Sequence, residues 1–146
     1  MSEHNLIRNL STLVALRTTE LEKLQSEQAA KQAMAERYRR NVERLTQLAA
    51  DTGASGKLPM ALASNCGAYK ETVLAMADSQ RLDLTMHEAD MAVSQRSLNA
   101  AWAKREVLGQ VLEKKQSVVA GEERARERKQ HDDLATQLWL RSQKPA

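Results

Sequence analysis

A single heptad register runs without a skip through the first third of the chain. Its steps alternate between three and four residues, and most of its positions are apolar. These positions, which we call the first seam, are Ile7, Leu10, Val14, Arg17, Leu21, Leu24, Gln28, Lys31, Ala35, Tyr38, Val42, Leu45 and Ala49. A repeat of 3.5 residues keeps one stripe facing a partner helix along a left-handed supercoil. The pattern therefore predicts a coiled-coil helix over residues 4–50. Arg17, Gln28 and Lys31 interrupt the stripe, either as a device that fixes register or partner or, as we favour, because the seam loosens there.

The second half of the chain is apolar over a wider arc and predicts a second, longer helix over residues 67–142. One seven-residue grid, the second seam, consists of Leu84, Met91, Leu98, Arg105, Leu112 and Val119. An adjacent stripe consists of Leu82, Met86, Ala89, Val93, Ala100, Ala103 and Val107. No proline interrupts the segment, and Ser64 or Asn65 can cap its start by accepting backbone N–H bonds.

The segment between these helices, residues 51–66, collects the residues that break helices. Gly53, Gly56 and Pro59 lie in it, and Gly67 follows it directly. Such a cluster predicts a bend that folds the chain into a single antiparallel hairpin. Residues whose numbers add up to about 118 should then lie opposite each other, at a rise of about 1.5 Å per residue.

The second helix should outlast the first, and we call its final part, residues 120–146, the overhang. Its shaft, "AGEERARERKQHDD", has no large apolar side chain, whereas Leu134, Leu138 and Trp139 restore an apolar face near the tip. A helix that is polar all round needs a reason to exist other than packing in its own hairpin.

The glycines of the bend also invite comparison with a loop that binds nucleotide phosphates. That loop needs G-x-x-x-x-G-K-[ST], presented by a strand. Here Gly56 and Lys57 are present, but Asp51 occupies the position of the first glycine and Leu58 that of the hydroxyl residue. The stretch is better explained as a turn, and we expect no bound nucleotide.

Other chemistry is equally poorly supported by the sequence. The net charge is +3, and basic residues alternate with acidic ones, which is typical of solvated helix surface and not of a nucleic-acid site. Cys66 is the only cysteine, and no apolar run is long enough to cross a membrane. The "HEAD" motif at His87 and the "KQHDD" motif at His131 are explained by solvated side chains. We expect a cytoplasmic protein without catalytic residues, cofactor or metal.

Taken together, the motifs resemble those of the FliJ family, a small component of the bacterial flagellar type III export apparatus. The resemblance spans nearly the whole chain. It rests on the "M-x-E-H" start with Leu6, Leu10 and Leu13, on Ser64 and Asn65 followed by Tyr69, on the "AW-x-K-R-E" run from Ala101 to Glu106, and on the "DDLATQ" and "QKPA" endings.

The resemblance implies an antiparallel two-helix coiled coil, similar to the rotor stalk of the rotary ATP synthase. Such a stalk is not an enzyme. It enters the pore of a hexameric export ATPase, promotes assembly of that ring, contacts the export-gate membrane protein and escorts export chaperones, at the inner-membrane export apparatus but without inserting into the membrane. The residues implied in the gate contact are Tyr38, Val42, Leu45, Ala49, Tyr69, Val73 and Met76.

Within this resemblance, the overhang is the best candidate for the part that contacts the ATPase ring. Its candidate contact residues are Arg124, Arg126, Arg128, Lys129, Leu134, Leu138 and Trp139. Two other classes of function stay open. A generic coiled-coil adaptor or holdase-type chaperone would share the hairpin but would bind no ATPase ring. A filament-forming structural protein would be expected to carry heptads to its C-terminus, which this sequence does not do.

Overall fold

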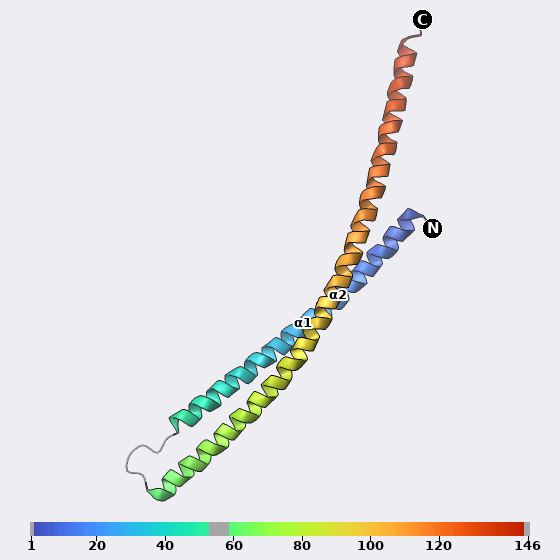
Figure 1. Cartoon of the computed structure of the whole chain (residues 1–146). Coiled ribbons are helices and arrows are strands. Elements are labelled where there is room, and N and C mark those ends of the chain that lie inside the picture. Colours follow the sequence, from blue (N-terminus) through green and yellow to red (C-terminus); the bar gives the residue numbers. More distant parts are fainter. Residues whose placement is uncertain (1, 53–58, 145–146) are drawn as a thin grey trace. The chain divides into compact units, whose positions relative to one another are not determined.

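The structure of the protein, a computed structural model, describes residues 2–52 and 59–144, which form two helices (Figure 1). Helix α1 spans Glu3–Asp51 and helix α2 spans Met60–Ser142, and these described ranges contain no strand. The helices pack against each other and α2 is the longer one, which confirms the all-α fold predicted from the heptads. Gly53, Gly56 and Lys57, on which the bend and the phosphate-loop comparison depended, lie outside the described residues.

Helix α2 begins at Met60, earlier than the expected start at residue 67. The carbonyl of Pro59 accepts a hydrogen bond from the backbone N–H of Ala63 at 3.0 Å, so the proline stands at the head of the helix. Proline is tolerated at this N-cap position because the backbone N–H groups at the start of a helix have no intrahelical acceptor, so its missing N–H is not needed. Ser64 and Asn65, expected as caps, lie inside α2 instead.

Burial along α1 confirms the first seam. Every one of its positions is buried or half-buried, and the most buried are Leu21, Gln28, Ala35 and Ala49. Ala35 is 0% exposed, since a small side chain lets the neighbouring helix approach closely. The 3.5-residue repeat therefore identified the buried face of α1 correctly.

Of the two apolar stripes predicted on α2, only the second seam is turned inward. All of its members are half-buried, whereas every member of the adjacent stripe is exposed, with Leu82 at 62%, Met86 at 66% and Val93 at 59%. The half-buried positions that alternate with the second seam include Gln80, His87 and Ser94, which are polar. The inward face of α2 therefore follows the seven-residue spacing of the second seam, although part of that face is polar.

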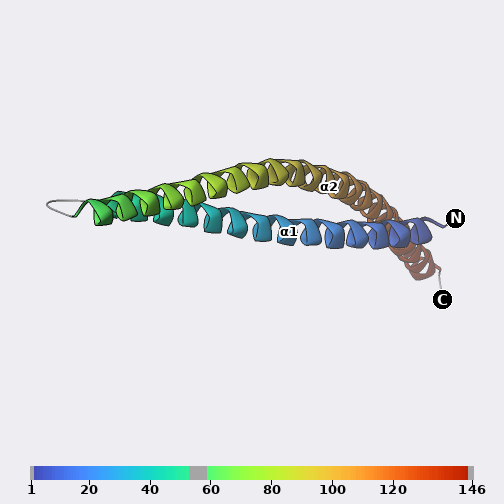
Figure 2. The same cartoon turned by 90° about the horizontal axis from the view of Figure 1, so that it is seen from below.

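The chain divides into two compact units. The first unit consists of Met1–Glu20 and Ala101–Ala146, and the second consists of Leu21–Ala100. Each unit pairs a segment of α1 with a segment of α2. In the second unit the two segments lie side by side in both views (Figures 1 and 2).

Polar side chains of the second unit bond across the two helices. Gln28 is 6% exposed, and its Nε2 donates to the backbone carbonyl of Met91 at 3.3 Å and to Oε1 of Gln95 at 3.2 Å. The Lys31 ammonium lies 2.8 Å from the Asp90 carboxylate, and by hydrogen bonding to it lowers the pKa of Asp90 below its ordinary value. The expectation that the seam loosens at Gln28 and Lys31 is therefore wrong, because both make specific contacts with α2.

His87 of the "HEAD" motif is another polar residue of the second unit that bonds across the two helices. Its Nε2 donates to the backbone carbonyl of Lys31 at 2.7 Å. The centroid of its ring lies 5.8 Å from the centroid of the Tyr38 ring. A half-buried ring held by a backbone carbonyl and an aromatic neighbour has a structural role. The neighbouring Glu88 points to another part of α1, where it pairs with Arg39 at 2.9 Å.

The pairing in the second unit is antiparallel, and its contacts fall at the predicted register or beyond it. His87 bonds to the carbonyl of Lys31, as the predicted sum of about 118 requires, whereas Gln28 also bonds to Gln95, and Thr46 accepts a hydrogen bond from Arg81. Several partners on α2 therefore lie further along the chain than expected. Figure 1 shows that the start of α2 extends past the end of α1.

A cross-link tests this pairing. With Cys66 replaced by serine, cysteines at Lys31 and Ser94, whose side chains are hydrogen-bonded, should be joined within one chain by a short bismaleimide. The control places the second cysteine at Leu82, which is exposed on the adjacent stripe, and should give little product. The readout is the mobility of the monomer on a denaturing gel. Products that join only separate chains would contradict the hairpin.

Candidate partner-binding surfaces

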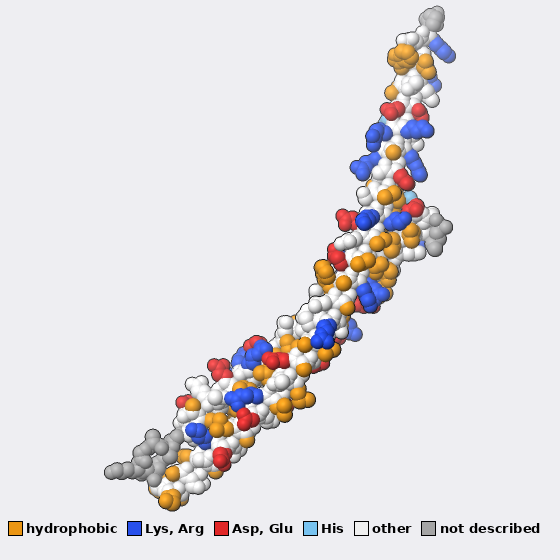
Figure 3. Space-filling view, in the orientation of Figure 1, with side chains coloured by type: hydrophobic (Ala, Val, Ile, Leu, Met, Phe, Trp, Pro, Cys, Tyr) orange, Lys and Arg blue, Asp and Glu red, His pale blue; other side chains and the backbone are white. Residues whose placement is uncertain are grey.

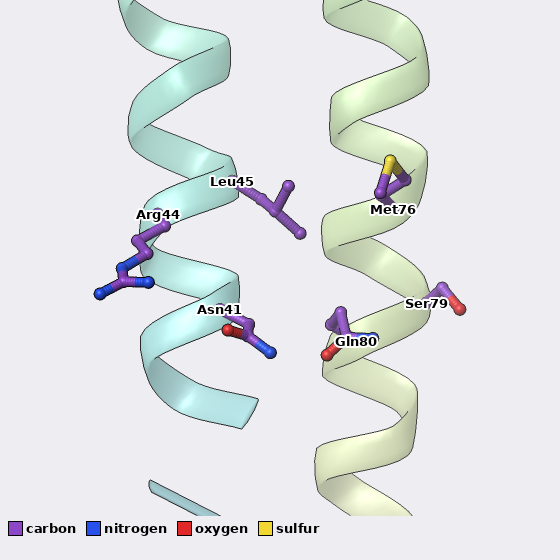
Figure 4. A pocket seen from close by; sticks show the side chains of 6 residues that line it. All are labelled: Asn41, Arg44, Leu45, Met76, Ser79 and Gln80. Atoms are coloured by element: carbon purple, nitrogen blue, oxygen red, sulfur yellow. The ribbon is translucent and has the colours of Figure 1, made fainter. Parts of the chain in front are cut away.

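A groove in the second unit brings together two of the residues implied in the gate contact. It has a volume of about 490 Å³ and is lined by Asn41, Arg44 and Leu45 of α1 and by Met76, Ser79 and Gln80 of α2 (Figure 4). Leu45 projects from α1 toward α2, while Arg44 and Ser79 project away from the space between the helices. Oε1 of Gln80 is buried and has no hydrogen-bond partner among the described residues.

The residues implied in the gate contact differ in their accessibility. Tyr69 and Met76 are 49% and 53% exposed, so their side chains are open to a partner. Tyr38, Val42 and Leu45 are half-buried, and the Leu45 side chain reaches the surface at the groove. Val73 is 4% exposed and Ala49 is 1% exposed, so these two residues pack in the hairpin.

The overhang is helical and exposed. In the first unit, Nε2 of His4 lies 3.6 Å from Oε1 of Glu123, and every described residue from 122 to 144 is exposed. All seven candidate ring-contact residues fall in this stretch. The four basic ones make no ion pair closer than 4.0 Å with another described residue. The seven side chains predicted to contact the ATPase ring are therefore accessible to a partner.

The apolar tip is broader than Leu134, Leu138 and Trp139 indicated. Leu138, Trp139 and Leu140 are 63%, 59% and 53% exposed, and three consecutive helical residues point in different directions. Figure 3 shows this cluster near the C-terminal end, beyond the charged shaft. Leu140 is a further exposed member of the tip that the sequence analysis did not include. It lines a shallow groove of about 650 Å³ with Gln137, Arg141, Gln143 and Lys144.

Metal binding and membrane spanning are the two other properties to consider for the described residues. No group of three or more His, Cys, Asp or Glu side chains in residues 2–52 and 59–144 is placed to hold a metal ion. Neither of the two described helices has a stretch that is both long enough and apolar enough to cross a membrane.

Comparison with known proteins agrees with this arrangement. The family model described as "Flagellar FliJ protein" matches residues 7–144, which includes both helices and the described overhang. The comparison with curated proteins finds no match, and neither does the comparison with solved structures. Because the family model covers nearly the whole chain, the protein belongs to the FliJ family and is a coiled-coil protein related to flagellar export.

Proposed function

We propose that this protein is the non-catalytic stalk of a flagellar export ATPase complex. In this role it inserts its overhang into the pore of a hexameric ATPase, promotes assembly of the ring and couples it to the export gate. The observation that carries the proposal is the overhang itself, a helix that is exposed on all sides, with a charged shaft and an apolar tip. An apolar surface that wraps around a helix is suited to a partner that surrounds it.

The stalk acts on the ring through unequal contacts. A single rod inside a six-fold ring presents a different side chain to each subunit, so the subunits cannot all be in the same environment. A partner shifts a conformational equilibrium only by its differential affinity for the states. Trp139 on one side of the tip and Leu140 on another supply such a difference, and the catalytic groups remain those of the ATPase.

The two parts of the overhang make different contributions to binding. Arg124, Arg126, Arg128 and Lys129 attract acidic groups at the rim of the pore over a distance set by ionic strength, and so raise the rate of association. Trp139 then anchors the complex, since buried aromatic side chains provide much of the binding energy at protein interfaces. At high salt, a higher concentration of stalk should therefore be needed for half-maximal stimulation of ATP hydrolysis. The maximal rate of hydrolysis should not change.

The gate contact is assigned to the groove of the second unit. Met76 offers exposed apolar surface in the groove, and Leu45 lines it from α1. Tyr69 adds an exposed side chain nearer the start of the same helix. This contact would place the stalk at the cytoplasmic face of the inner membrane without inserting it. Val73, Val42 and Tyr38 then support the groove from within the hairpin.

Met76→Glu should abolish most of the gate binding. The substitution adds a charge to an apolar contact surface and should weaken binding of the cytoplasmic part of the gate protein about tenfold or more. Met86→Glu is the matched control, because Met86 is 66% exposed on the same helix and does not line the groove. Isothermal titration with purified gate domain gives both affinities. Equal losses for the two variants would remove the groove from the proposal.

Gel filtration with the cognate ATPase tests the function as a whole. A stalk should co-elute with the assembled ring and raise its ATP hydrolysis. An adaptor or holdase chaperone with the same hairpin would do neither, although it would still bind client proteins. Escort of export chaperones is a further activity of the proposed stalk, and co-purification from cell extract would identify which chaperones take part.

A further inference from the structure

A second groove, in the first unit, is formed by residues that belong to neither surface above. It has a volume of about 370 Å³ and is lined by Arg17 of α1 and by Ala103, Lys104, Val107 and Leu108 of α2. The α2 residues form two adjacent i, i+4 rows, so they present a continuous strip of one helix face. Val107 is 61% exposed although it is apolar. The floor of the groove is therefore an uncovered apolar strip along a helix.

Among the described residues, the rim of this groove carries one unpaired positive charge, that of Lys104, beside the paired guanidinium of Arg17. Lys104 is exposed and makes no ion pair closer than 4.0 Å with another described residue. Arg17 is half-buried, and its Nη1 lies 3.0 Å from the carboxylate of Glu20, but its Nε is buried and has no hydrogen-bond partner among the described residues. The buried Nε is out of reach of a partner, but the Arg17 side chain is 35% exposed as a whole, and a guanidinium can bind a second carboxylate beside that of Glu20.

The neighbouring residues do not neutralise this charge. Arg105, beside Lys104, donates from Nε to the hydroxyl of Thr18 at 3.2 Å, and its Nη1 lies 3.6 Å from the Glu106 carboxylate. The charges of Arg105 and Glu106 offset each other. The positive charge of Lys104 therefore remains on this strip of α2.

We infer that this groove binds an amphipathic helix of a partner protein that carries acidic residues beside its apolar stripe. The apolar stripe covers Val107 and Leu108, and flanking carboxylates reach the Lys104 ammonium and the Arg17 guanidinium. A helix fits because rows at i and i+4 on α2 accept the ridges of another helix, whereas an extended peptide would need a sheet edge to pair with. This binding is separate from the ATPase and gate contacts of the proposed stalk.

A pair of synthetic helices tests the inference on the full chain. Each is about three heptads long with leucine at the a and d positions, and the flanking positions are glutamate in one and lysine in the other. Fluorescence anisotropy of the labelled peptides should show binding of the acidic helix only. Lys104→Glu should weaken that binding about fivefold to tenfold, and Val107→Asn should weaken it by a similar factor.

Lys23→Glu is the charge-matched control, because Lys23 is exposed in the second unit and does not line the groove. It should leave the affinity unchanged. Lys104 and Val107 are both exposed, so their variants should melt like the unmodified chain. Equal or tighter binding of the lysine helix would overturn the inference, and so would equal weakening by Lys23→Glu and Lys104→Glu. Stimulation of the ATPase is measured separately, so either proposal can fail without the other.

Discussion

A chain truncated after Ala120 is expected to lose its stimulation of the cognate export ATPase and to keep nearly the same melting temperature. The described residues from 122 to 144 are all exposed, so their removal takes little buried surface from the hairpin. Among the described residues, the cross-helix ion pair that is removed is the exposed pair of His4 and Glu123, and surface pairs contribute about 0 to 1 kcal/mol. A loss of activity would therefore report on a missing contact and not on unfolding.

A single substitution sharpens the test. Trp139→Ala should raise the stalk concentration that gives half-maximal stimulation about tenfold or more, since a large aromatic anchor is removed from the tip. Trp102→Ala is the matched control, because Trp102 is 55% exposed in the same unit but lies outside the overhang. Both variants are compared by titrating them into a fixed amount of ATPase and measuring phosphate release.

Unchanged stimulation by the truncated chain would assign the ring contact to another part of the protein. If the truncated chain stimulated the ATPase as well as the full chain does, the overhang would not be the coupling element. The bend end, with Tyr69 and Met76, would then become the candidate for the ring contact.

Leu21→Ala should be the most destabilising single truncation of an aliphatic side chain in the second unit. Leu21 is 8% exposed in the first seam, and shortening a buried leucine to alanine costs about 2 to 5 kcal/mol. Leu82→Ala removes the same atoms from a residue that is 62% exposed and should change the free energy of unfolding by about 0.5 kcal/mol or less. Urea denaturation followed by circular dichroism measures both values. Comparable losses for the two leucines would show that the adjacent stripe of α2 is buried in solution.

Much of the fold could be predicted because a heptad is a local property. Whether one side of α1 is apolar every 3.5 residues can be read from residues 7–49 alone, and every position of that register is buried or half-buried. The overhang followed from equally local facts, the end of the apolar grid at Val119 and the return of large side chains at Leu134. In the site, the exposure of the basic shaft and of Trp139 followed from the same pattern.

The choice of the inward face of α2 required the structure. That helix is apolar on two sides, and hydrophobicity alone would have favoured Leu82, Met86 and Val93 over Gln80, His87 and Ser94. The polar residues are turned inward because they find partners on α1 or fit beside it, as His87 does at the carbonyl of Lys31. Accessibility in the gate region was decided in the same way, with Val73 buried and Met76 exposed only three residues later.

The register between the helices also required the structure, and so did the start of α2 at Met60. A repeat along one helix says which face is buried but not which residue of the other helix lies opposite, since sliding by a whole heptad preserves the apolar match. Polar residues resolve that choice, because the buried Nε2 of Gln28 finds acceptors only where Met91 and Gln95 are in reach. These partners are 63 and 67 residues away along the chain, so only the folded arrangement of both helices could select them.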